Sequence, residues 1–457
     1  MDQNTIHSPW QQGSILDVAI ASLSVTGDGV GRWQDRVVFV PDTVPGDRVR
    51  VRLIRVKPSY AQGQSLELLE SSPQRVRPPC IVADKCGGCQ WQTVAYGEQL
   101  TAKEANVCHA LERIGQFNPV PLDNIVPAPD PLGYRNKVTY PLAEHQGRVL
   151  AGYYRKGSHR LVNLNQCPVQ DDRLNPLLAG IKGDIQDHRW PIYQERTHTG
   201  NLRHLGLRIG RRTGEQLITL VGRDRDLPQL EAQAQTWLED YPGAVGVCFN
   251  HHPEPGNRIF GDRTEVIAGQ AHLREILGGL EFQIGSTTFF QVNTEQAENL
   301  IHCLLEHLDL RGNEGIVDAY CGVGTLSLPL AKKGGWVVGI ERHRESVAQA
   351  RINAKNNQIN NAEFMDAAVE DWLPQHQEKP DIVVLDPPRK GCDRRVLAAL
   401  LATKPSRIVY VSCNPATLAR DLRELCHQGD YRLERVQPFD FFPQTAHVET
   451  LAFLCTN

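Results

Sequence analysis

The stretch "EGIVDAYCGVGTLSLPLAKKG", Glu314–Gly334, decides the fold. It predicts a buried strand, then a glycine-rich turn, then a helix. The same alternation returns in "GWVVGIERHRESVAQARINAKNNQI", "PDIVVLDPPRKG" and "SRIVYVSCNPATLARDL". Strands that alternate with helices build parallel sheets, so residues 285–457 are predicted to form a doubly wound, Rossmann-like α/β domain. Ligands of such domains bind at the carboxyl ends of the strands.

The glycine-rich turn, which follows Asp318 at the end of the first strand, favours one class of cofactor. Gly322 and Gly324 lack a Cβ, so the backbone there can approach a ligand closely. The next predicted strand ends at Glu341, whose carboxylate can accept the hydroxyl hydrogens of a ribose. Ser327 stands where a dinucleotide fingerprint has its third glycine, and no P-loop lysine follows. The pattern favours S-adenosylmethionine over a dinucleotide, with a purely structural turn as the alternative.

Two later strands also end in side chains that can bind or react with a ligand. In "VVLDPPRKG", Asp386 ends a strand and the two prolines after it block a helix, so its carboxylate can bond the edge of a flat heterocycle or simply cap a turn. In "VYVSCNPATL", Cys413 lies between a strand and a helix, where helix N–H groups favour a thiolate. The alternative for Cys413 is a buried structural cysteine.

The C-terminal stretch "FFPQTAHVETLAFL" places Glu449 among apolar residues at the start of a terminal strand. Such a carboxylate is either one half of an ion pair or a base with a raised pKa. The pattern by itself favours the ion pair.

The N-terminal part has a different pattern. Residues 11–72 read as short strands separated by Gly-Asp, Pro-Asp and Pro-Gly turns. In "RVRVRLIRVK", Arg48–Lys57, charged and apolar side chains alternate, which puts the arginines on one face of a strand. This predicts a small OB-like β-barrel with a basic outer face, or a strand whose charges are merely solvated.

Between these parts lies "PPCIVADKCGGCQW", with Cys80, Cys86 and Cys89 within ten positions. Three close cysteines indicate a metal or cluster site, which usually has four ligands. A helix is predicted from Ala95 to Gln116, and residues 130–284 show a mixed pattern whose topology does not follow from periodicity. We assign residues 73–284 to a central α/β domain, in which 95–129 is the part that can pack with the C-terminal α/β domain.

The composition limits the class of protein. The 457 residues are 40% hydrophobic and 22% charged, as in globular proteins of about two to four domains. The sequence contains no apolar run long enough for a membrane span, and its N-terminus does not have the pattern of a secretory signal. Both observations predict a cytoplasmic location. Its twelve cysteines are therefore expected as thiols, ligands or catalysts rather than as a disulfide framework. The net charge of −4 does not indicate a nucleic-acid binder, so any such role needs local basic patches.

Together the motifs resemble those of the RNA 5-methyluridine methyltransferase family, which methylates uracil C5 in ribosomal or transfer RNA. The matching stretches are "FFQVN" (Phe289–Asn293), "DAYCGVGTLSL", "DPPRKG", "SCNP" and "HVET". The predicted barrel resembles that family's TRAM domain. Cys80, Cys86 and Cys89, with Cys167 in "QCPV", match the iron–sulfur pattern of its ribosomal-RNA branch. The resemblance covers nearly the whole chain.

The resemblance implies a role for each matching residue. Cys413 would be the nucleophile that adds to uracil C6, Glu449 the general base that removes the C5 proton, and Asp386 the group that holds the uracil edge. The positions that match cofactor contacts are Gln291, Tyr320, Thr325, Glu341 and Asp386. Tyr320 stands where the family often has Phe, which preserves stacking, and Thr325 stands where Asn is common.

The resemblance also implies partners. It predicts a monomer, without membrane contact, that methylates 23S rRNA through a covalent Cys–C6 adduct and carries a 4Fe–4S cluster on Cys80, Cys86, Cys89 and Cys167. A transfer-RNA substrate, a non-catalytic RNA-binding protein with a degenerate methyltransferase domain, and a small-molecule methyltransferase are the alternatives. Zinc is the alternative to the cluster. A flipped uracil could stack on Phe289, unless that side chain belongs to the core. The basic residues available for RNA phosphates are Arg48, Arg50, Arg52, Arg55, Lys57, Arg135 and Lys137.

Overall fold

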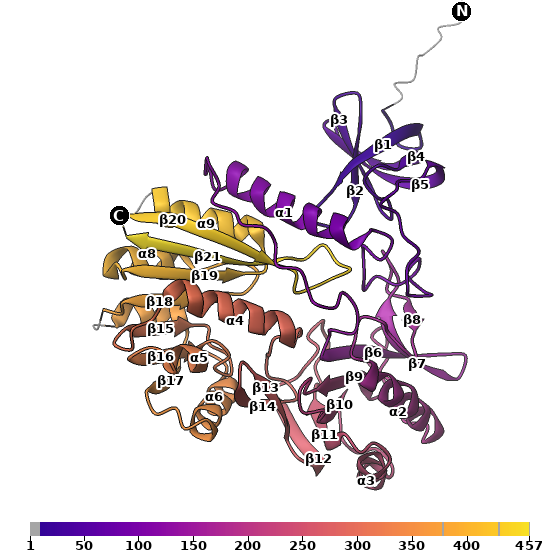
Figure 1. Ribbon diagram of the computed structural model, residues 1–457. Coiled ribbons are helices and arrows are strands. Elements are labelled where there is room, and N and C mark those ends of the chain that lie inside the picture. Colours follow the sequence, from indigo (N-terminus) through magenta and orange to yellow (C-terminus); the bar gives the residue numbers. More distant parts are fainter. Residues whose placement is uncertain (1–9, 377–378, 428–429, 457) are drawn as a thin grey trace, which may run out of the picture.

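The computed structural model describes residues 10–376, 379–427 and 430–456. The chain folds into an N-terminal barrel, a central sheet with helices, and a C-terminal sheet flanked by helices (Figure 1). Among the described residues, no helix combines the length and the apolar character that crossing a bilayer requires.

The N-terminal part is a closed five-stranded barrel, as the turn pattern predicted. Its strand order is β1-β2-β3-β5-β4. The strands are β1 (Ile15–Leu23), β2 (Gly29–Trp33), β3 (Arg36–Val40), β4 (Arg48–Val56) and β5 (Tyr60–Glu70). In β4, Val49, Val51 and Leu53 are buried, whereas the arginines are exposed or half-buried. Arg48 and Arg50 form ion pairs with acidic residues of β1 and β5, so these two arginines are not free cations for RNA phosphates.

Helix α1 (Tyr96–Arg113) connects the N-terminal barrel to the catalytic domain. Its buried Val107 and Leu111 share a hydrophobic core with Leu418 and Leu422 of α9 (Pro415–His427). The N-terminal end of α1 lies toward the barrel, and the rest of the helix runs along the C-terminal sheet (Figure 1). This chain segment therefore packs with the catalytic domain, although it precedes the central sheet in sequence.

The central domain is a seven-stranded sheet with two helices. Its strand order is β12-β11-β10-β9-β6-β7-β8. The strands are β6 (Lys137–His145), β7 (Arg148–Tyr154), β8 (Leu161–Asn163), β9 (Leu202–Ile209), β10 (Gln216–Gly222), β11 (Ala244–His251) and β12 (Arg263–Gly269). The helical segments are η1 (Asp172–Leu174), α2 (Asn175–Asp187) and α3 (Leu230–Asp240). Trp190 and Trp237 anchor its core.

A hairpin joins the central sheet to the catalytic sheet. It consists of β13 (His272–Leu277) and β14 (Leu280–Gly285). Its Leu273 and Phe282 share a core with Val384 of the catalytic sheet. The hairpin therefore belongs with the catalytic core, although it lies on the N-terminal side of the boundary at 284/285 that the sequence pattern suggested.

The catalytic domain is a doubly wound sheet, as the strand–helix alternation predicted. Its strand order is β17-β16-β15-β18-β19-β21-β20, and β21 runs antiparallel to both of its neighbours. The strands are β15 (Gly315–Ala319), β16 (Trp336–Glu341), β17 (Ala362–Asp366), β18 (Ile382–Leu385), β19 (Arg407–Ser412), β20 (Tyr431–Phe439) and β21 (Glu449–Thr456). The remaining helical segments are α4 (Thr294–Leu308), α5 (Ser327–Ala331), α6 (Arg344–Asn356), α7 (Val369–Trp372), η2 (Leu373–Gln375) and α8 (Arg394–Thr403).

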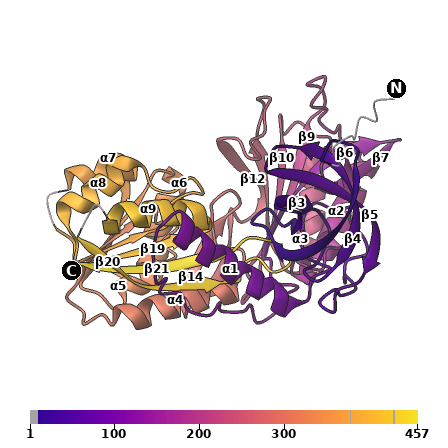
Figure 2. The same cartoon turned by 90° about the horizontal axis from the view of Figure 1, so that it is seen from above.

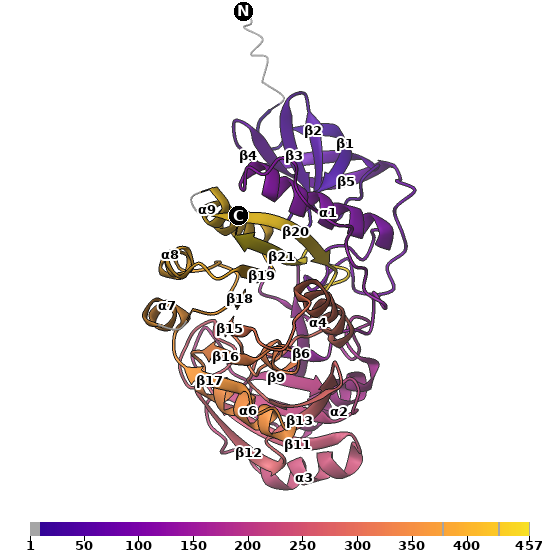
Figure 3. The same cartoon turned by 60° about the vertical axis from the view of Figure 1, so that its left-hand side comes forward.

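Helices cover both faces of this sheet. Side chains of α4, α5 and α6 pack in the core on one face, and those of α7, α8, α9 and α1 pack in the core on the other. The two layers are visible in Figure 3, with α7, α8 and α9 on one flank and α4 on the other. Seen from above, the catalytic sheet lies apart from the central sheet and barrel, with α1 between them (Figure 2).

Candidate active site and cysteine cavity

The carboxyl ends of the parallel strands gather the predicted site residues at one edge of the sheet. The register places Ala319, the last residue of β15, between Ile340 of β16 and Leu385 of β18. The strand order reverses between β15 and β18, which is where ligands of such sheets bind. The predicted site residues at or just after these strand ends are Tyr320, Glu341, Asp386 and Cys413.

The turn after β15 has the open, left-handed backbone that its glycines predicted. Tyr320, Gly322 and Gly324 have φ angles of 70°, 55° and 88°. A Cβ added at Gly322 would meet no heavy atom within 4 Å, so this position faces open space. The Gly322 N–H donates to the Glu341 carboxylate at 3.3 Å. The turn and Glu341 therefore form one unit with an open side for a ligand.

Two carboxyl groups at this edge resist ionisation. Asp318 is 1% exposed; the Ser327 hydroxyl donates to its Oδ2, whereas its Oδ1 has no partner within the described residues. Burial raises the pKa of Asp318 to about 7, and the neighbouring Glu341 charge acts in the same direction. Burial, followed by the charges of Asp318 and Glu341, also raises the pKa of Asp386 to about 7. A cation brought to this edge would favour both carboxylates.

Cys413 and Glu449 lie at the same edge of the sheet. Ser412, the last residue of β19, pairs with Thr450 of β21; Cys413 directly follows Ser412, and Glu449 directly precedes Thr450. Burial and the Glu449 charge raise the pKa of Cys413 to about 11. The expectation that the start of α9 favours the thiolate is therefore not met, because burial outweighs it.

Glu449 is a buried acid rather than half of an ion pair. Its side chain is 5% exposed, and no described residue forms a hydrogen bond or ion pair with its carboxylate. Burial raises the pKa of Glu449 well above its ordinary value, and the Asp386 charge raises it further. The ion pair that the sequence pattern favoured is absent from the described structure, and the environment is that of a base with a raised pKa.

Arg389 is a site residue that the sequence reasoning missed. Its positive charge opposes the raised pKa values of both Cys413 and Glu449. Its backbone carbonyl accepts hydrogen bonds from Asn414 Nδ2 at 3.1 Å and Thr417 Oγ1 at 3.3 Å, which ties the segment after β18 to the start of α9. The stretch "DPPRKG" contained the signal, since a cation three residues after a strand-end acid lies near the same edge.

The stretch "FFQVN" divides between surface and core. Phe289 is 64% exposed, whereas Phe290 is buried and packs against Phe282. The core interpretation thus fits the second phenylalanine and not the first. Gln291 and Thr325 are half-buried, and neither side chain forms a hydrogen bond with a described residue. Both side chains therefore remain available to a ligand.

Two family models match the chain. Residues 275–457 match the tRNA (Uracil-5-)-methyltransferase family, and residues 9–66 match the TRAM domain. An uncharacterized RNA methyltransferase of Thermosynechococcus vestitus is 60% identical over 98% of this chain and 100% of its own length. Another, from Nostoc sp., is 60% identical over 98% of this chain and 97% of its own length. The chain belongs to the S-adenosylmethionine-dependent RNA uracil-5-methyltransferase family.

A solved structure supports the same family assignment for this methyltransferase. The Pyrococcus abyssi tRNA (uracil-54, C5)-methyltransferase in complex with S-adenosyl-L-homocysteine is 30% identical, with a TM-score of 0.77. The similarity covers 96% of this chain and all of that one. It therefore includes the barrel and the central sheet as well as the catalytic domain.

The catalytic edge of the methyltransferase fits the cofactor of its family. The open space at Gly322 leaves room beside the backbone, and Glu341 lies against that turn. The acids Asp318 and Asp386 favour a positively charged group, and S-adenosylmethionine carries a sulfonium. These acidic side chains thus match a cationic nucleoside better than a phosphate ester.

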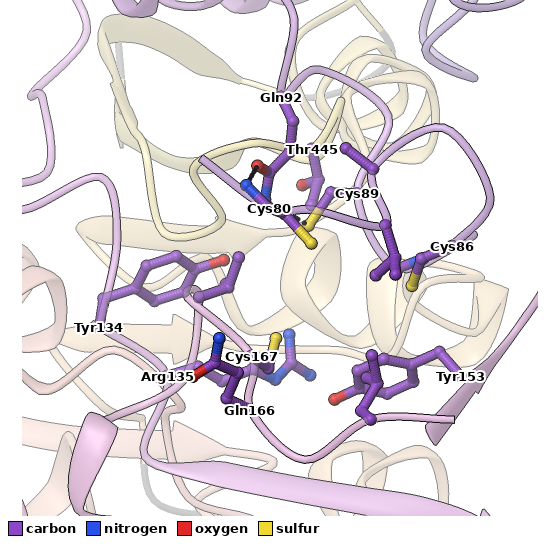
Figure 4. A pocket seen from close by; sticks show the side chains of 15 residues that line it. Cys80, Cys86, Cys89, Gln92, Tyr134, Arg135, Tyr153, Gln166, Cys167 and Thr445 are labelled. Carbon is purple, nitrogen blue, oxygen red and sulfur yellow. Dashed lines mark hydrogen bonds between the residues drawn. The ribbon is translucent and has the colours of Figure 1, made fainter. Parts of the chain in front are cut away.

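The four predicted cysteine ligands line one cavity, which has a volume of about 170 Å³. Cys80, Cys86 and Cys89 come from the segment after the barrel, and Cys167 from the loop after β8. Figure 4 shows Cys80, Cys89 and Cys86 above the space, with Cys167 on the opposite side. The labelled non-cysteine side chains around it are Gln92, Tyr134, Arg135, Tyr153, Gln166 and Thr445.

All four cysteines are free thiols in this methyltransferase structure. Burial raises the pKa of Cys89 to about 12 and also raises that of Cys86 and Cys167, and the other thiols in the cavity add to each rise. Within the part of the chain that the structure describes, no group of three or more His, Cys, Asp or Glu residues is placed to hold a metal ion. The cavity thus gathers the predicted ligands without drawing them to a single point.

Proposed function

We propose that this methyltransferase transfers a methyl group to C5 of a uracil in RNA, with Cys413 as nucleophile and Glu449 as base. The observation that carries the proposal is the position of these two residues next to the paired Ser412 and Thr450, where the Glu449 charge acts on the Cys413 thiol. The glycine-rich turn for the cofactor lies at the same sheet edge. A thiol and a buried carboxyl group so placed can act in turn on adjacent carbons of one ring.

The proposed reaction begins at Cys413. Its thiolate forms a bond to uracil C6, and the C5–C6 π electrons move toward C5 and the neighbouring carbonyl. Bound S-adenosylmethionine supplies the methyl group, which C5 takes as the sulfonium carbon–sulfur bond breaks with its electron pair on sulfur. The Glu449 carboxylate then removes the C5 proton, the C–H pair restores the double bond, and the C6–S bond breaks to return the thiolate. The released proton ends on Glu449.

The protonation states explain why neighbouring cations matter. The pKa of Cys413, raised to about 11, keeps this thiol protonated near neutral pH, and the raised pKa of Glu449 disfavours its carboxylate, whereas the reaction needs both groups ionised. Arg389 favours both charged forms. We assign Arg389 the role of promoting thiolate formation when the uracil approaches.

We assign the other predicted residues as follows. The turn at Tyr320 and Thr325, with Glu341 and Gln291, would hold the cofactor, and Asp386 would bond the uracil edge. Phe289 is 64% exposed and would offer a stacking surface to a base that has left its helix.

The proposed substrate is 23S rRNA, and the four-cysteine pattern supports it. Transfer RNA is the second candidate, because the protein of the solved structure with a TM-score of 0.77 acts on uracil-54 of tRNA. Mass spectrometry of RNA from cells that lack the gene separates them. Loss of one 5-methyluridine from 23S rRNA supports the first candidate, and loss confined to tRNA supports the second.

We propose that the cysteine cavity holds a 4Fe–4S cluster on Cys80, Cys86, Cys89 and Cys167. The proposal is supported by the four thiols around one cavity, because a multi-atom cluster needs a space between its ligands rather than one point. Protein purified without oxygen should be brown and contain iron and sulfide. A colourless protein with one zinc per chain would overturn the assignment.

The catalytic proposal is tested with Cys413→Ala and labelled S-adenosylmethionine. We expect methyl incorporation into RNA to fall by about 10⁴-fold or more, while RNA binding remains. Cys426→Ala is the matched control. Cys426 lies near the end of α9, the helix that begins two residues after Cys413, and this variant should keep its activity. Activity of Cys413→Ala equal to that of the control would contradict the nucleophile assignment.

A further inference from the structure

The loop that leads into Glu449 is buried to an unusual degree. We call it the base loop, residues 440–448, between β20 and β21. All of it is buried except Phe442, which is half-buried, and His447, which is exposed. Figure 1 shows this yellow segment extending from the strand ends beneath α1, and Figure 2 shows it reaching toward the barrel side. A buried loop needs partners for its backbone groups, and most of these partners come from outside the catalytic sheet.

Gln444 is the centre of these contacts. Its carbonyl accepts from the backbone N–H of Gln90 at 3.1 Å and of Trp91 at 3.0 Å. Its own N–H donates to Gln99 Oε1 at 2.9 Å, and Gln99 Nε2 donates to its side-chain oxygen at 3.2 Å. Gln444 also has a left-handed φ of 69°, which a non-glycine residue adopts only when its surroundings hold it there. The loop conformation therefore depends on the segment from Gln90 to Gln99.

Gln99 also ties that segment together. Its Nε2 donates to the Trp91 carbonyl at 3.1 Å and to the Val94 carbonyl at 2.9 Å. Gln99 is 1% exposed, so water cannot replace these bonds. One amide thus joins the start of α1, the turn before it and the base loop.

Further contacts fix the base loop on either side of Gln444. The buried Lys103 ammonium pairs with Asp440 and donates to the Phe442 carbonyl at 3.1 Å. The Tyr134 hydroxyl donates to the Pro443 carbonyl at 3.1 Å. Ala446 packs with Trp91 and with Leu23 and Val44 of the barrel. These anchors lie in the N-terminal half of the chain.

The same contacts reach the cysteine cavity. Gln90 and Trp91 directly follow Cys89, and Thr445 lines the cavity itself. The cysteine segment and the base loop are therefore neighbours joined by backbone hydrogen bonds, and Glu449 lies five residues beyond Gln444.

We propose that Gln99 is a positioning residue for proton removal: with Gln90 and Trp91 it clamps Gln444, and the clamped base loop sets the position of Glu449. This inference rests on the proposed role of Glu449 as base. Glu449 begins β21 and has no side-chain bond of its own to a described residue, so its position depends on the backbone that leads into it. The clamp gives the N-terminal domains a direct part in the chemistry.

The chemistry makes the inference specific to one step. Formation of the C6–S bond and methyl transfer require Cys413 and the cofactor turn after β15, and no hydrogen bond joins either of these to the clamp within the described residues. Removal of the C5 proton requires Glu449. A loosened base loop should therefore slow breakdown of the methylated covalent complex and leave its formation unchanged.

The test compares Gln99→Met with Gln216→Met. Methionine keeps the length of the side chain and removes the amide. Gln216 is a buried glutamine of the central sheet whose Nε2 donates to the Arg173 carbonyl and forms no bond with the base loop, so it controls for loss of a buried amide. We expect Gln99→Met to form methylated covalent complex at the parent rate in a single turnover. Its breakdown should slow by about 10-fold to 100-fold, since an ångström of misplacement has effects of that size. The KM values for RNA and for the cofactor should equal those of the parent protein.

Hydrogen exchange gives a readout independent of activity. Amides of residues 440–449 should exchange faster in Gln99→Met than in Gln216→Met. Gln99→Asn, which keeps the amide on a side chain one methylene shorter, should show an effect of the same kind. If Gln99→Met fails to fold, Gln99→Asn carries the test. Equal breakdown rates in the Gln99 variant and the control, or equal loss of formation and breakdown, would overturn the inference.

Glu449→Gln separates this inference from the function on which it rests. If Glu449→Gln releases product at the parent rate, the proposed base is wrong. If Glu449→Gln accumulates the covalent complex and the Gln99 variants do not, the base assignment stands and only the clamp is refuted.

Discussion

The catalytic edge and the cysteine cavity are both buried sites, but they are held in opposite ways. At the catalytic edge each group lies at an end of a strand of one sheet or next to it, so hydrogen-bond register sets the spacing. The cysteine cavity is lined by segments on either side of the central sheet's first strands and by Thr445 of the catalytic domain. The first site is positioned by regular structure. The second is positioned by loops, which a bound group can hold together.

The two sites also share an electrostatic problem. In each, burial and like charges raise the pKa values of several acidic groups, carboxyls and a thiol in one and thiols in the other. Each is relieved by a positive group, which Arg389 and a sulfonium provide at the catalytic edge and metal ions would provide in the cavity. Substitutions at either site can test this comparison.

After the loss of Cys413, removing one cavity thiol should have the largest effect. We expect Cys89→Ser to lower bound iron by about tenfold or more, because the proposed cluster then has one ligand fewer. Because Gln90 and Trp91 hold the base loop, breakdown of the covalent complex should also slow, whereas cofactor affinity should not change. Iron analysis, single-turnover kinetics and calorimetry measure the three effects. Cys108→Ser, in α1 away from the cavity, is the control, and an iron content equal to that control would refute the ligand assignment.

Replacing Arg389 should come next. Its charge lowers the pKa of Cys413, so Arg389→Met should raise that pKa above about 11 and reduce the thiolate fraction at every lower pH. Adduct formation should therefore fall by about tenfold at neutral pH, since a unit of pKa is a factor of ten in the ionised fraction. In both proteins the rate should rise as pH rises from 7 to 9. A rate that does not depend on pH over this range would contradict the assignment of a buried thiol.

The difference between the sites explains what the sequence could predict. Asp386, Cys413 and Glu341 were found because strand ends are readable from alternating patterns, and parallel strands bring their ends together. The barrel was readable from its turns and from the alternation in Arg48–Val56. The topology of the central sheet was not, because its β6 pairs with β9 across a long insertion that no local pattern records. The role of Arg389 and the clamp at Gln444 could not be predicted either, because both depend on tertiary contacts alone.

A smaller effect is expected for cofactor binding. Asp318 and Asp386 have pKa values raised to about 7, and a sulfonium favours their charged forms. Binding should release protons near neutral pH, and affinity should rise as pH rises through 7, by up to about tenfold per unit for one proton released. Calorimetry in buffers of different ionisation enthalpy measures the proton count. Asp386→Asn should lower this count, whereas Asp371→Asn, an exposed surface acid, should not. Proton uptake on binding would contradict the acidic site.

The smallest effect is expected on the outer face of the barrel, where the two halves of β4 differ. Arg48 and Arg50 are paired with acids, whereas Arg52 and Arg55 form no ion pair within the described residues. Replacing Arg52 and Arg55 with glutamine should weaken RNA binding by a few-fold and make its salt dependence shallower by about 0.7 for each phosphate that the protein no longer neutralises. The same change at Arg48 and Arg50 should have less effect, because their charges already have partners. Binding measured over a range of salt concentrations separates the pairs, and an equal weakening for both would show that RNA displaces the acids from the paired arginines.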